Sequence, residues 1–510
     1  MRRELALVTL AVTLTACGGD GGATPPSPAA QTTRPVTGPT TEPPPQKIAW
    51  GPCTDIQRPG EQATAKPDPS LRCGKLTVPL DYAKPGGESI ELALIKIAAT
   101  DKANRLGSLV FNFGGPGASG VDTLAQAAKA FASLGTRYDL VSFDPRGVQR
   151  SSGVRCGSGK ELDEFMALNT LPDTEETWKR SLAATKEFVE LCRRDSGKIL
   201  PYVGTVNAAR DMDVLRAALG DQKLNYFGMS YGTQLGGVYA TLFPDKVGRM
   251  VLDAPLDPAV SFEERTIVQT EGFQKVYETF LKSCVQDGCR LGKTVEEADK
   301  KVKALMTSLV DKPLKVRDRE LTQGLASTGL ASALYSQYSW PLLEEALAQA
   351  SEGEGGGLMY LADIYVGRSE DGTYDTSMTS FPAITCVDNA ERPDEAALRR
   401  TQEKAMEISP LFGNAGSGFT CAMWPVPGSD EAKRVDADGS APIVVVGGKN
   451  DPATPYEWAP KLTEQLKTGV LVTYEGQGHG AYVSGNQCVI STVNGYLLQG
   501  KLPAEGTTCS

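Results

Sequence analysis

Histidine is nearly absent from this chain, because His479 is the only one in 510 residues. No two cysteines form a C-x-x-C pair, so the usual ligand sets for zinc are missing and we expect no metal. Lysine and arginine form no run, and the formal net charge is −10, so the sequence lacks the basic patch that nucleic-acid binding requires. We therefore expect neither a metal centre nor a nucleic-acid partner, and nothing in the sequence implies an organic cofactor.

The apolar run at the start of the chain is too short to span a bilayer as a stable anchor. Residues 1–16 join a basic start, MRRE, to the apolar LALVTLAVTLTA, as in a signal peptide. Cys17 follows Leu14-Thr15-Ala16 as in a bacterial lipobox, where the cysteine is acylated and becomes the mature N-terminus. An ordinary secretory signal, with Cys17 incidental, is the alternative. The lipobox predicts a protein lipid-anchored through Cys17 to the outer face of the bacterial cell membrane, or partly released from it.

The segment after Cys17 is rich in proline, glycine and threonine. Residues 18–46 contain almost no large apolar side chains and cannot bury a core. We therefore expect residues 17–46 to be a lipidated N-terminus followed by a flexible, semi-extended tether. A tether between anchor and folded body fits the lipoprotein hypothesis better than plain secretion.

Ten cysteines remain besides Cys17, an even number that indicates disulfides in an exported protein. The sequence alone does not determine their connectivity. Pairing of neighbours closes the shortest loops and is the arrangement we expect. It joins Cys53 to Cys73, Cys156 to Cys192, Cys284 to Cys289, Cys386 to Cys421 and Cys488 to Cys509.

Short apolar strands alternate with helices in two separate parts of the chain. GSLVFNF, YDLVSFD, KLNYFGMS and VGRMVLDAP have the composition of buried strands, with amphipathic helices such as AARDMDVLRAALG between them. This pattern predicts an α/β fold with a mostly parallel sheet and helices on both faces. It covers residues 47–259 and returns in 436–510, whereas residues 260–435 are mostly helical in period. We expect one α/β body interrupted by a helical insertion.

A G-x-S-x-G motif, Gly228-Met229-Ser230-Tyr231-Gly232, lies where a strand turns into a helix. The motif is common by chance, but this context is that of a nucleophile elbow, which exposes a serine hydroxyl above the sheet. Such a serine needs a base, and His479 follows the final strand in a glycine-rich loop. Asp451 follows the preceding strand; alone it could be an Asp-Pro turn starter, but it can also orient the imidazole. The chain order Ser230, Asp451, His479 is that of α/β-hydrolases.

The glycine-rich stretch FNFGGPGASG, residues 111–120, has two interpretations. Gly115, Gly117 and Gly120 match the G-x-G-x-x-G pattern of dinucleotide-binding turns, with Asp144 ending the next strand. The stretch also follows the strand from which α/β-hydrolases take one donor of the oxyanion hole, the other being the N–H after the nucleophile. We favour the hole, with the Tyr231 and Gly115 N–H groups as donors and glycine at 115 because a side chain would crowd the reacting carbonyl.

Several of these motifs together resemble a known family. CGKLTVPLDYAKP, FNFGGPGASG, YDLVSFDPRGVQRSS, NYFGMSYGTQLGG, VGRMVLDAPLDP and GKNDPATP…GQGHG are similar to the exported tripeptidyl aminopeptidases of actinobacteria, serine exopeptidases related to proline iminopeptidases. The resemblance runs from about residue 50 to the C-terminus. It implies an α/β-hydrolase fold, a helical cap or lid over the site, and release of short peptides from free N-termini. Phe113 departs from the histidine of proline iminopeptidases, which we take as harmless because the hole uses backbone groups.

The resemblance also implies the site residues. Ser230, Asp451 and His479 match the catalytic triad, and Gly115 and Tyr231 match the oxyanion hole. We expect activity to need neutral His479 and to fall as the pH drops through roughly 6 to 7.

An exopeptidase must also recognise the substrate's α-ammonium, which calls for a carboxylate in the pocket. Asp388, in AITCVDNAERPD, is the candidate, and a solvated loop acid is the alternative interpretation. An esterase or lipase on the same fold and a non-catalytic binding lipoprotein are the competing functions. The sequence does not determine the length of the released peptide or the oligomeric state.

Overall fold

The computed structural model describes residues 46–56, 68–169, 174–413, 416 and 418–510. The predicted signal peptide 1–16, Cys17 and all of the predicted tether except Gln46 lie outside the described residues. Within the described part of the chain, no helix has the length and apolar character needed to cross a membrane.

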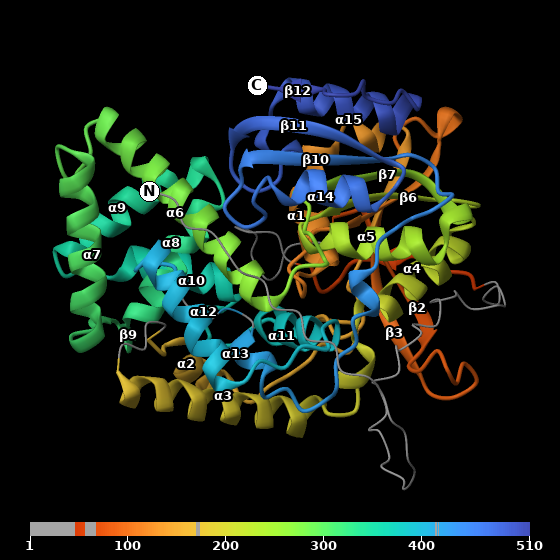
Figure 1. Cartoon of the computed structure of the whole chain (residues 1–510). Helices are drawn as coiled ribbons and strands as arrows, with labels where there is room; N and C mark the ends of the chain where they lie inside the picture. Colours follow the sequence, from red (N-terminus) through yellow and green to blue (C-terminus); the bar gives the residue numbers. More distant parts are fainter. Residues whose placement is uncertain (1–45, 57–67, 170–173, 414–415, 417) are drawn as a thin grey trace, which may run out of the picture. The chain divides into compact units, whose positions relative to one another are not determined.

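The centre of the fold is a ten-stranded mixed sheet in the order β1-β2-β3-β5-β4-β6-β7-β10-β11-β12 (Figure 1). Strand β3 pairs antiparallel with β2 and β5, whereas β5, β4, β6, β7, β10, β11 and β12 run parallel to one another. The strands are β1 (Gly51–Pro52), β2 (Leu71–Pro79), β3 (Ser89–Ile97), β4 (Gly107–Asn112), β5 (Tyr138–Phe143), β6 (Leu224–Met229), β7 (Val247–Asp253), β10 (Ile443–Asn450), β11 (Gly469–Gln477) and β12 (Thr508–Cys509).

Helices cover both faces of this sheet, as the run of apolar residues in its central strands requires. Helices α1 (Gly120–Ala127) and α15 (Gln487–Gln499) pack with Phe227 and Val251 on one face. On the other face α5 (Tyr231–Leu242) approaches so closely that a Cβ on Gly236 would lie 2.6 Å from the Tyr226 ring. Helices α4 (Thr205–Leu219) and α14 (Trp458–Gln465) complete the layers. The predicted α/β class is confirmed.

The chain between β7 and β10 is mainly helical and has a hydrophobic cluster of its own. Its members come from several helices and include Tyr277, Phe280, Leu309, Leu330 and Leu358. The elements here are α6 (Phe262–Gln286), α7 (Val295–Asp311), the hairpin β8 (Leu314–Val316) and β9 (Arg319–Leu321), α8 (Gln323–Leu334), α9 (Trp340–Ser351), α10 (Gly356–Val366), α11 (Ser377–Val387), α12 (Glu395–Ile408) and α13 (Gly418–Cys421).

Two earlier helices, α2 (Gly159–Met166) and α3 (Glu175–Ser196), pack against this helical segment. Arg368 forms an ion pair with Asp163 of α2 at 2.6 Å, and the Trp178 indole of α3 donates a hydrogen bond to Glu395 of α12 at 3.0 Å. Helices α2 and α3 thus extend the helical layer, although they belong to the part predicted as the first half of the α/β body.

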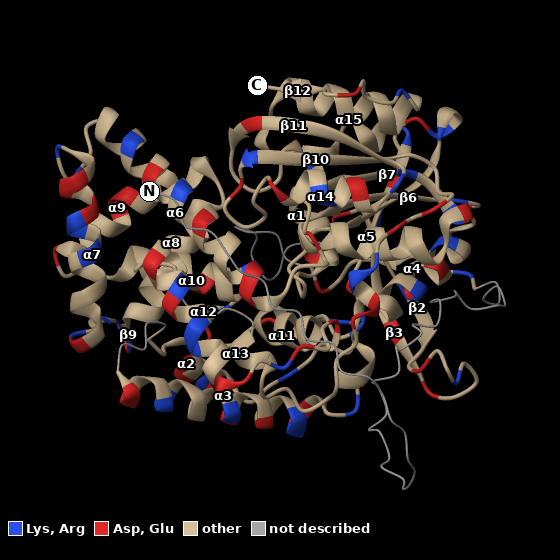
Figure 2. Cartoon of the chain, viewed as in Figure 1, with Lys and Arg blue, Asp and Glu red and all other residues tan. Residues whose placement is uncertain are grey.

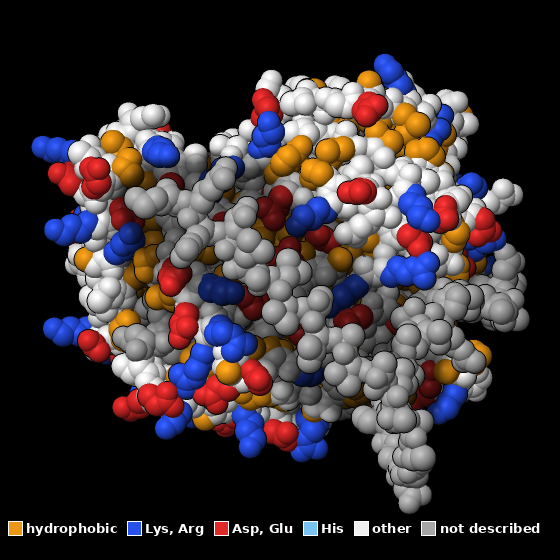
Figure 3. Space-filling model, in the orientation of Figure 1, with side chains coloured by type: hydrophobic (Ala, Val, Ile, Leu, Met, Phe, Trp, Pro, Cys, Tyr) orange, Lys and Arg blue, Asp and Glu red, His pale blue; other side chains and the backbone are white. Residues whose placement is uncertain are grey.

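Charged side chains of both signs alternate along the outer helices α3 and α7 (Figure 2). On the face drawn in Figure 3, acidic and basic side chains are likewise mixed, with small hydrophobic groups between them. This interspersed pattern is that of a solvated protein surface.

All five disulfides predicted by neighbour pairing are present: Cys53–Cys73, Cys156–Cys192, Cys284–Cys289, Cys386–Cys421 and Cys488–Cys509. Glu344 lies near the third pair, but both thiols there are already used in the disulfide and are not free to ligate a metal.

A fully buried ion pair, Arg146 with Asp211, ties the end of β2 to α4 and to the loop after β5. The Arg146 guanidinium donates to both Asp211 oxygens, at 2.7 and 2.6 Å, and to the carbonyls of Pro79, Leu80 and Tyr202. All five N–H donors of the guanidinium are therefore hydrogen-bonded, and these bonds offset the cost of burying its charge.

Replacing Arg146 with methionine leaves the Asp211 carboxylate buried without its counter-charge. We expect Arg146→Met to lower the free energy of unfolding by about 3–5 kcal/mol, measured by urea denaturation. The double variant Arg146→Met/Asp211→Asn should recover part of the loss because it also removes the buried charge. Equal losses in the single and double variants would contradict this explanation.

Candidate active site

Ser230 occupies a sharp turn between β6 and α5, with φ 54° and ψ −124°. Close backbone approach explains the two glycines of the motif. A Cβ on Gly228 would lie 2.3 Å from the Gly232 carbonyl oxygen, and a Cβ on Gly232 would lie 2.5 Å from that of Asn112. The turn places Ser230 on the wall of a cavity of about 470 Å³.

His479 and Asp451 lie beside one another after β11 and β10. The His479 Nδ1–H donates to the Asp451 carboxylate, with both oxygens at 2.9 Å. Asp451 is held in turn by the backbone N–H groups of Ala453 and Thr454, each at 2.9 Å, and by the Thr454 hydroxyl at 3.0 Å. The carboxylate thus fixes the tautomer that leaves Nε2 without a proton.

Burial alone would lower the pKa of His479, but the charge and hydrogen bond of Asp451 outweigh it, so that pKa is raised above its ordinary value. The helical segment also holds this residue. The His479 backbone N–H donates to the Tyr335 carbonyl at 2.8 Å, and the two rings meet edge to face at 5.3 Å.

Asp253, at the end of β7, holds the loop that carries His479. Its buried carboxylate accepts the backbone N–H groups of Ala481 at 2.9 Å and Tyr482 at 2.8 Å. Burial raises the pKa of Asp253 to about 6, against the lowering effect of these hydrogen bonds. Sequence analysis missed this residue; the available signal was a carboxylate ending an apolar strand.

Ser230 and His479 line the same cavity. Within the described residues, the imidazole hydrogen-bonds to Asp451 and approaches the Thr454 hydroxyl at 3.4 Å, and no hydrogen bond joins it to the serine. Catalytic hydrogen bonds often shorten only when substrate is bound. The two side chains therefore share a site, and the proton transfer between them is part of the proposal below.

The glycine loop packs directly on the serine turn. A Cβ on Gly114 would lie 2.7 Å from the Met229 carbonyl oxygen and 2.8 Å from the Ser230 Cβ. At Gly115, with φ 102°, a Cβ would instead meet the loop's own backbone, 2.8 Å from the Gly117 nitrogen. The backbone of the loop itself therefore requires glycine at 115. This reason differs from the predicted one, which was that a side chain would crowd the substrate carbonyl.

The dinucleotide interpretation needs Asp144 to be open to a ribose, and it is not. Asp144 is fully buried and accepts the Ser119 hydroxyl at 2.6 Å and the Val121 N–H at 3.2 Å, at the start of α1. Gly115 and Tyr231 instead line the cavity with Ser230, as an oxyanion hole requires.

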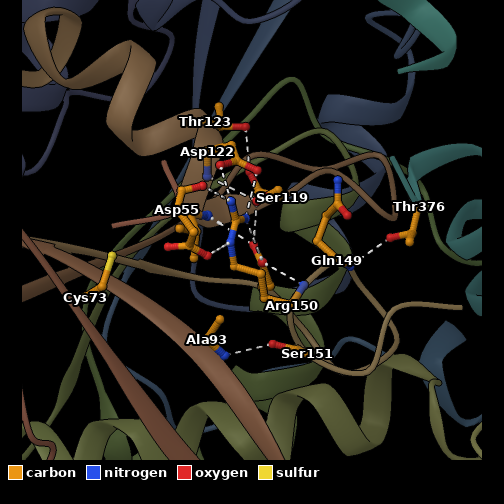
Figure 4. Close-up of polar contacts among 12 residues, drawn as sticks. Asp55, Cys73, Ala93, Ser119, Asp122, Thr123, Gln149, Arg150, Ser151 and Thr376 are labelled. Carbon is orange, nitrogen blue, oxygen red and sulfur yellow. Dashed lines mark hydrogen bonds and ion pairs between the residues drawn. The ribbon is translucent and has the colours of Figure 1, made fainter. Parts of the chain in front are cut away.

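Arg150 forms ion pairs that hold α1, the helix that follows the glycine loop. Its guanidinium pairs with Asp55 at 2.7 Å and with Asp122 of α1 at 2.9 Å (Figure 4). The next residue back, Gln149, donates its backbone N–H to the Thr376 hydroxyl at 2.7 Å, just before α11. One short loop therefore holds both α1 and the start of α11.

Asp388 ends α11 and lines the same cavity as Ser230 and His479. Its two oxygens accept the Thr205 N–H at 2.7 Å and the Thr205 hydroxyl at 2.5 Å, and the Tyr231 hydroxyl donates to that threonine at 2.5 Å. Burial raises the pKa of Asp388 to about 7, opposed by the Thr205 hydrogen bonds and the Arg265 charge. The alternative of a solvated loop acid is wrong, because Asp388 is 5% exposed.

The cavity therefore brings together Gly115, Ser230, Tyr231, Asp388 and His479, with Asp451 behind the imidazole. Arg265 and Tyr335 are among the lining residues that sequence analysis missed. Neither lies in a motif or next to a glycine turn, so no local signal distinguishes them.

The proton of Asp253 gives a measurable pH dependence of stability. The native state keeps this proton up to about pH 6 and the unfolded state only to about pH 4, so stability falls as the pH rises between these values. Relative to Asp253→Asn, we expect the wild-type free energy of unfolding to decrease by up to about 3 kcal/mol across this window. Parallel pH curves from urea denaturation would contradict the assignment.

Relatives of this chain are known. A family model described as "TAP-like protein" matches residues 409–509. Serine protease Hip1 of Mycobacterium tuberculosis is 37% identical, with 91% of each chain covered, and a protein named Carboxylesterase B from the same species is 37% identical, with 86% of each covered.

Tripeptidyl aminopeptidase of Streptomyces lividans is 32% identical over 86% of this chain and 84% of its own length. These similarities cover most of this chain and most of each relative. The chain therefore belongs to the tripeptidyl aminopeptidase family of actinobacterial serine hydrolases, with the α/β-hydrolase fold.

Proposed function

We propose that this protein is an exported serine exopeptidase that releases short peptides, in particular tripeptides, from free N-termini. The observation that carries the proposal is the position of Asp388, a buried carboxylate on the wall of the cavity that contains Ser230 and His479. A carboxylate in that position can bind an α-ammonium while the serine attacks a carbonyl farther along the peptide.

The proposed reaction uses an acyl-enzyme. His479 Nε2 takes the Ser230 proton as the hydroxyl attacks the scissile carbonyl, and Asp451 stabilises the imidazolium. The Gly115 and Tyr231 N–H groups bind the oxyanion, each worth about 3 kcal/mol. His479 then protonates the leaving amine, and water hydrolyses the ester on Ser230.

Recognition of the N-terminus is linked to the oxyanion hole through side chains. Tyr231 supplies one proposed oxyanion N–H, and its hydroxyl donates to Thr205, which holds both oxygens of Asp388. The amine site and the reacting carbonyl are thus held by one connected set of residues.

Ester hydrolysis is the second candidate, because part of the cavity is apolar. Phe113, Phe273, Met378 and Phe381 line it and would suit an acyl chain. A relative named Carboxylesterase B agrees with this alternative. The buried Asp388 favours the peptidase, since an acyl pocket has no use for a carboxylate.

We also propose that Cys17 carries a lipid anchor that holds the enzyme on the outer face of the cell membrane. The lipobox and the five disulfides, which form outside the reducing cytosol, support this location. Metabolic labelling with an alkyne fatty acid in an actinobacterial host should tag the wild type but not Cys17→Ala. Equal labelling of both would contradict the anchor.

The decisive comparison uses one tripeptidyl p-nitroanilide with its amine free or acylated. We expect rapid hydrolysis of the free form, loss of activity in Ser230→Ala, and little hydrolysis of the acylated form. Asp388→Asn should lower kcat/KM for the free form on the order of 10²-fold, as expected for losing a buried charge contact, and spare a simple p-nitrophenyl ester.

Glu370→Gln is the matched control, because it removes an exposed acid from the same helical segment. Asp388→Asn with an unchanged preference for free amines would exclude the proposed amine site. Rapid ester cleavage without peptide turnover in the wild type would identify an esterase.

The pH profile should depend on the substrate. Ester hydrolysis needs neutral His479, so it should fall as the pH drops through a value above 6.5, because Asp451 raises that pKa. Free-amine peptides need ionised Asp388 as well, so their kcat/KM should fall more steeply below about pH 7. Stopped assays from pH 4 to 9 test both slopes. An ester profile that stays flat to pH 4 would exclude His479 as the base.

A further inference from the structure

Helix α6 presents three side chains to the cavity at helical spacing. Arg265, Gln269 and Phe273 follow one another at i, i+4 and i+8, and all three line the cavity. Along the helix these three side chains change from charged (Arg265) through polar (Gln269) to apolar (Phe273). Arg265 and Asp388 both line this cavity, and each of these two charges acts on the pKa of the other.

Arg265 has no partner within the part of the chain that the structure describes. Its guanidinium makes no hydrogen bond and no ion pair, and its Nε is buried without an acceptor. Burial lowers the pKa of Arg265, against the raising effect of Asp388, Asp257 and Glu391. Arg265 as a whole is half-buried, and leaving its buried Nε–H without an acceptor costs free energy.

None of the three neighbouring carboxylates accepts a hydrogen bond from Arg265 among the described residues. Asp388 is held by Thr205, Asp257 accepts the Ala259 N–H at 3.0 Å, and Glu391 accepts the Phe262 N–H at 3.1 Å. They stabilise the positive charge of Arg265 through space but do not use its donors. This differs from Arg146, whose donors are all taken by a carboxylate and carbonyls.

The N-terminal residue of a peptide offers the two groups that this pair would recognise. Its ammonium and its carbonyl oxygen are separated by only the Cα and carbonyl carbon, so neighbouring acidic and basic groups can bind both at once. A substrate side-chain carboxylate fits less well, because it would lie beside the like-charged Asp388.

We propose that Arg265 donates a hydrogen bond to the main-chain carbonyl oxygen of the substrate's N-terminal residue, whose ammonium binds Asp388. This rests on the proposed aminopeptidase function and assigns Arg265 as a substrate-binding residue. Because every peptide has this carbonyl, the contact selects for a peptide N-terminus whatever the side chain.

The test compares a tripeptidyl p-nitroanilide with its analogue in which an (E)-alkene replaces the first peptide bond. The alkene keeps the shape and the free amine but lacks the carbonyl acceptor. We expect the wild type to prefer the amide by roughly 10- to 100-fold in kcat/KM, as for a hydrogen bond to a charged donor. Arg265→Met should lose that preference by slowing only the amide, and Arg265→Lys should keep part of it.

Lys282→Met is the matched control, because it removes the same charge from an exposed position on α6. Thermal unfolding of each variant separates lost binding from lost folding. Arg265→Met that keeps the preference for the amide, or that slows amide and alkene equally, would overturn the proposal. So would a loss confined to substrates with an acidic side chain, which would assign Arg265 to a side-chain carboxylate.

Failure of the underlying function gives a different result. If the wild type cleaves acylated and free tripeptides equally well, the aminopeptidase proposal fails, whatever Arg265 does. If free amines are preferred and the alkene is cleaved as fast as the amide, only the role of Arg265 is wrong.

Discussion

The site depends on one geometric constraint, which is that the carboxyl ends of parallel strands meet at the same edge of a sheet. Strands β6, β7, β10 and β11 are successive neighbours, and each ends in a residue or turn that the site uses. Met229 lies in register with Asp253, so the serine turn begins beside the carboxylate that holds the histidine loop. Ser230, Asp451 and His479 are far apart in the chain, and the whole helical segment separates β7 from β10, yet the strand order places all three residues at one edge of the sheet.

Buried charged side chains occur in two different environments in this protein. Arg146 and Asp211 are fully buried and hydrogen-bonded, and neither lines the cavity, so their ion pair is a structural one. The charged groups around the cavity lack such complete partners. Burial raises the pKa of Asp388 to about 7, and Arg265 has N–H donors without an acceptor. Perturbed and unpartnered groups of this kind gather where a substrate supplies the missing partner.

The helical segment takes part in the site as well as lying beside it. The Tyr335 carbonyl accepts the His479 backbone N–H, and side chains of α6 and α11 line part of the cavity. The loop at Gln149 and Arg150 fastens the beginning of α11 and the beginning of α1 to the α/β part of the chain. This loop therefore contacts both the helix that follows the proposed oxyanion loop and the helix that precedes Asp388, the proposed amine-binding residue.

The sequence by itself determined the fold class and the order Ser230, Asp451, His479, and it predicted the pairing of neighbouring cysteines that the structure then established. These features are local: a tight glycine turn, a residue placed just after an apolar strand, and short loops closed by neighbouring thiols. It also pointed to Asp388, but only through the chemical need for a carboxylate. Tertiary structure alone decided that Asp388 is buried beside Thr205, that Asp253 holds the histidine loop and that Arg265 faces the cavity. Those facts depend on how α6, α11 and the sheet pack together. Contacts between residues that are far apart in the sequence carry no local motif from which they could be predicted.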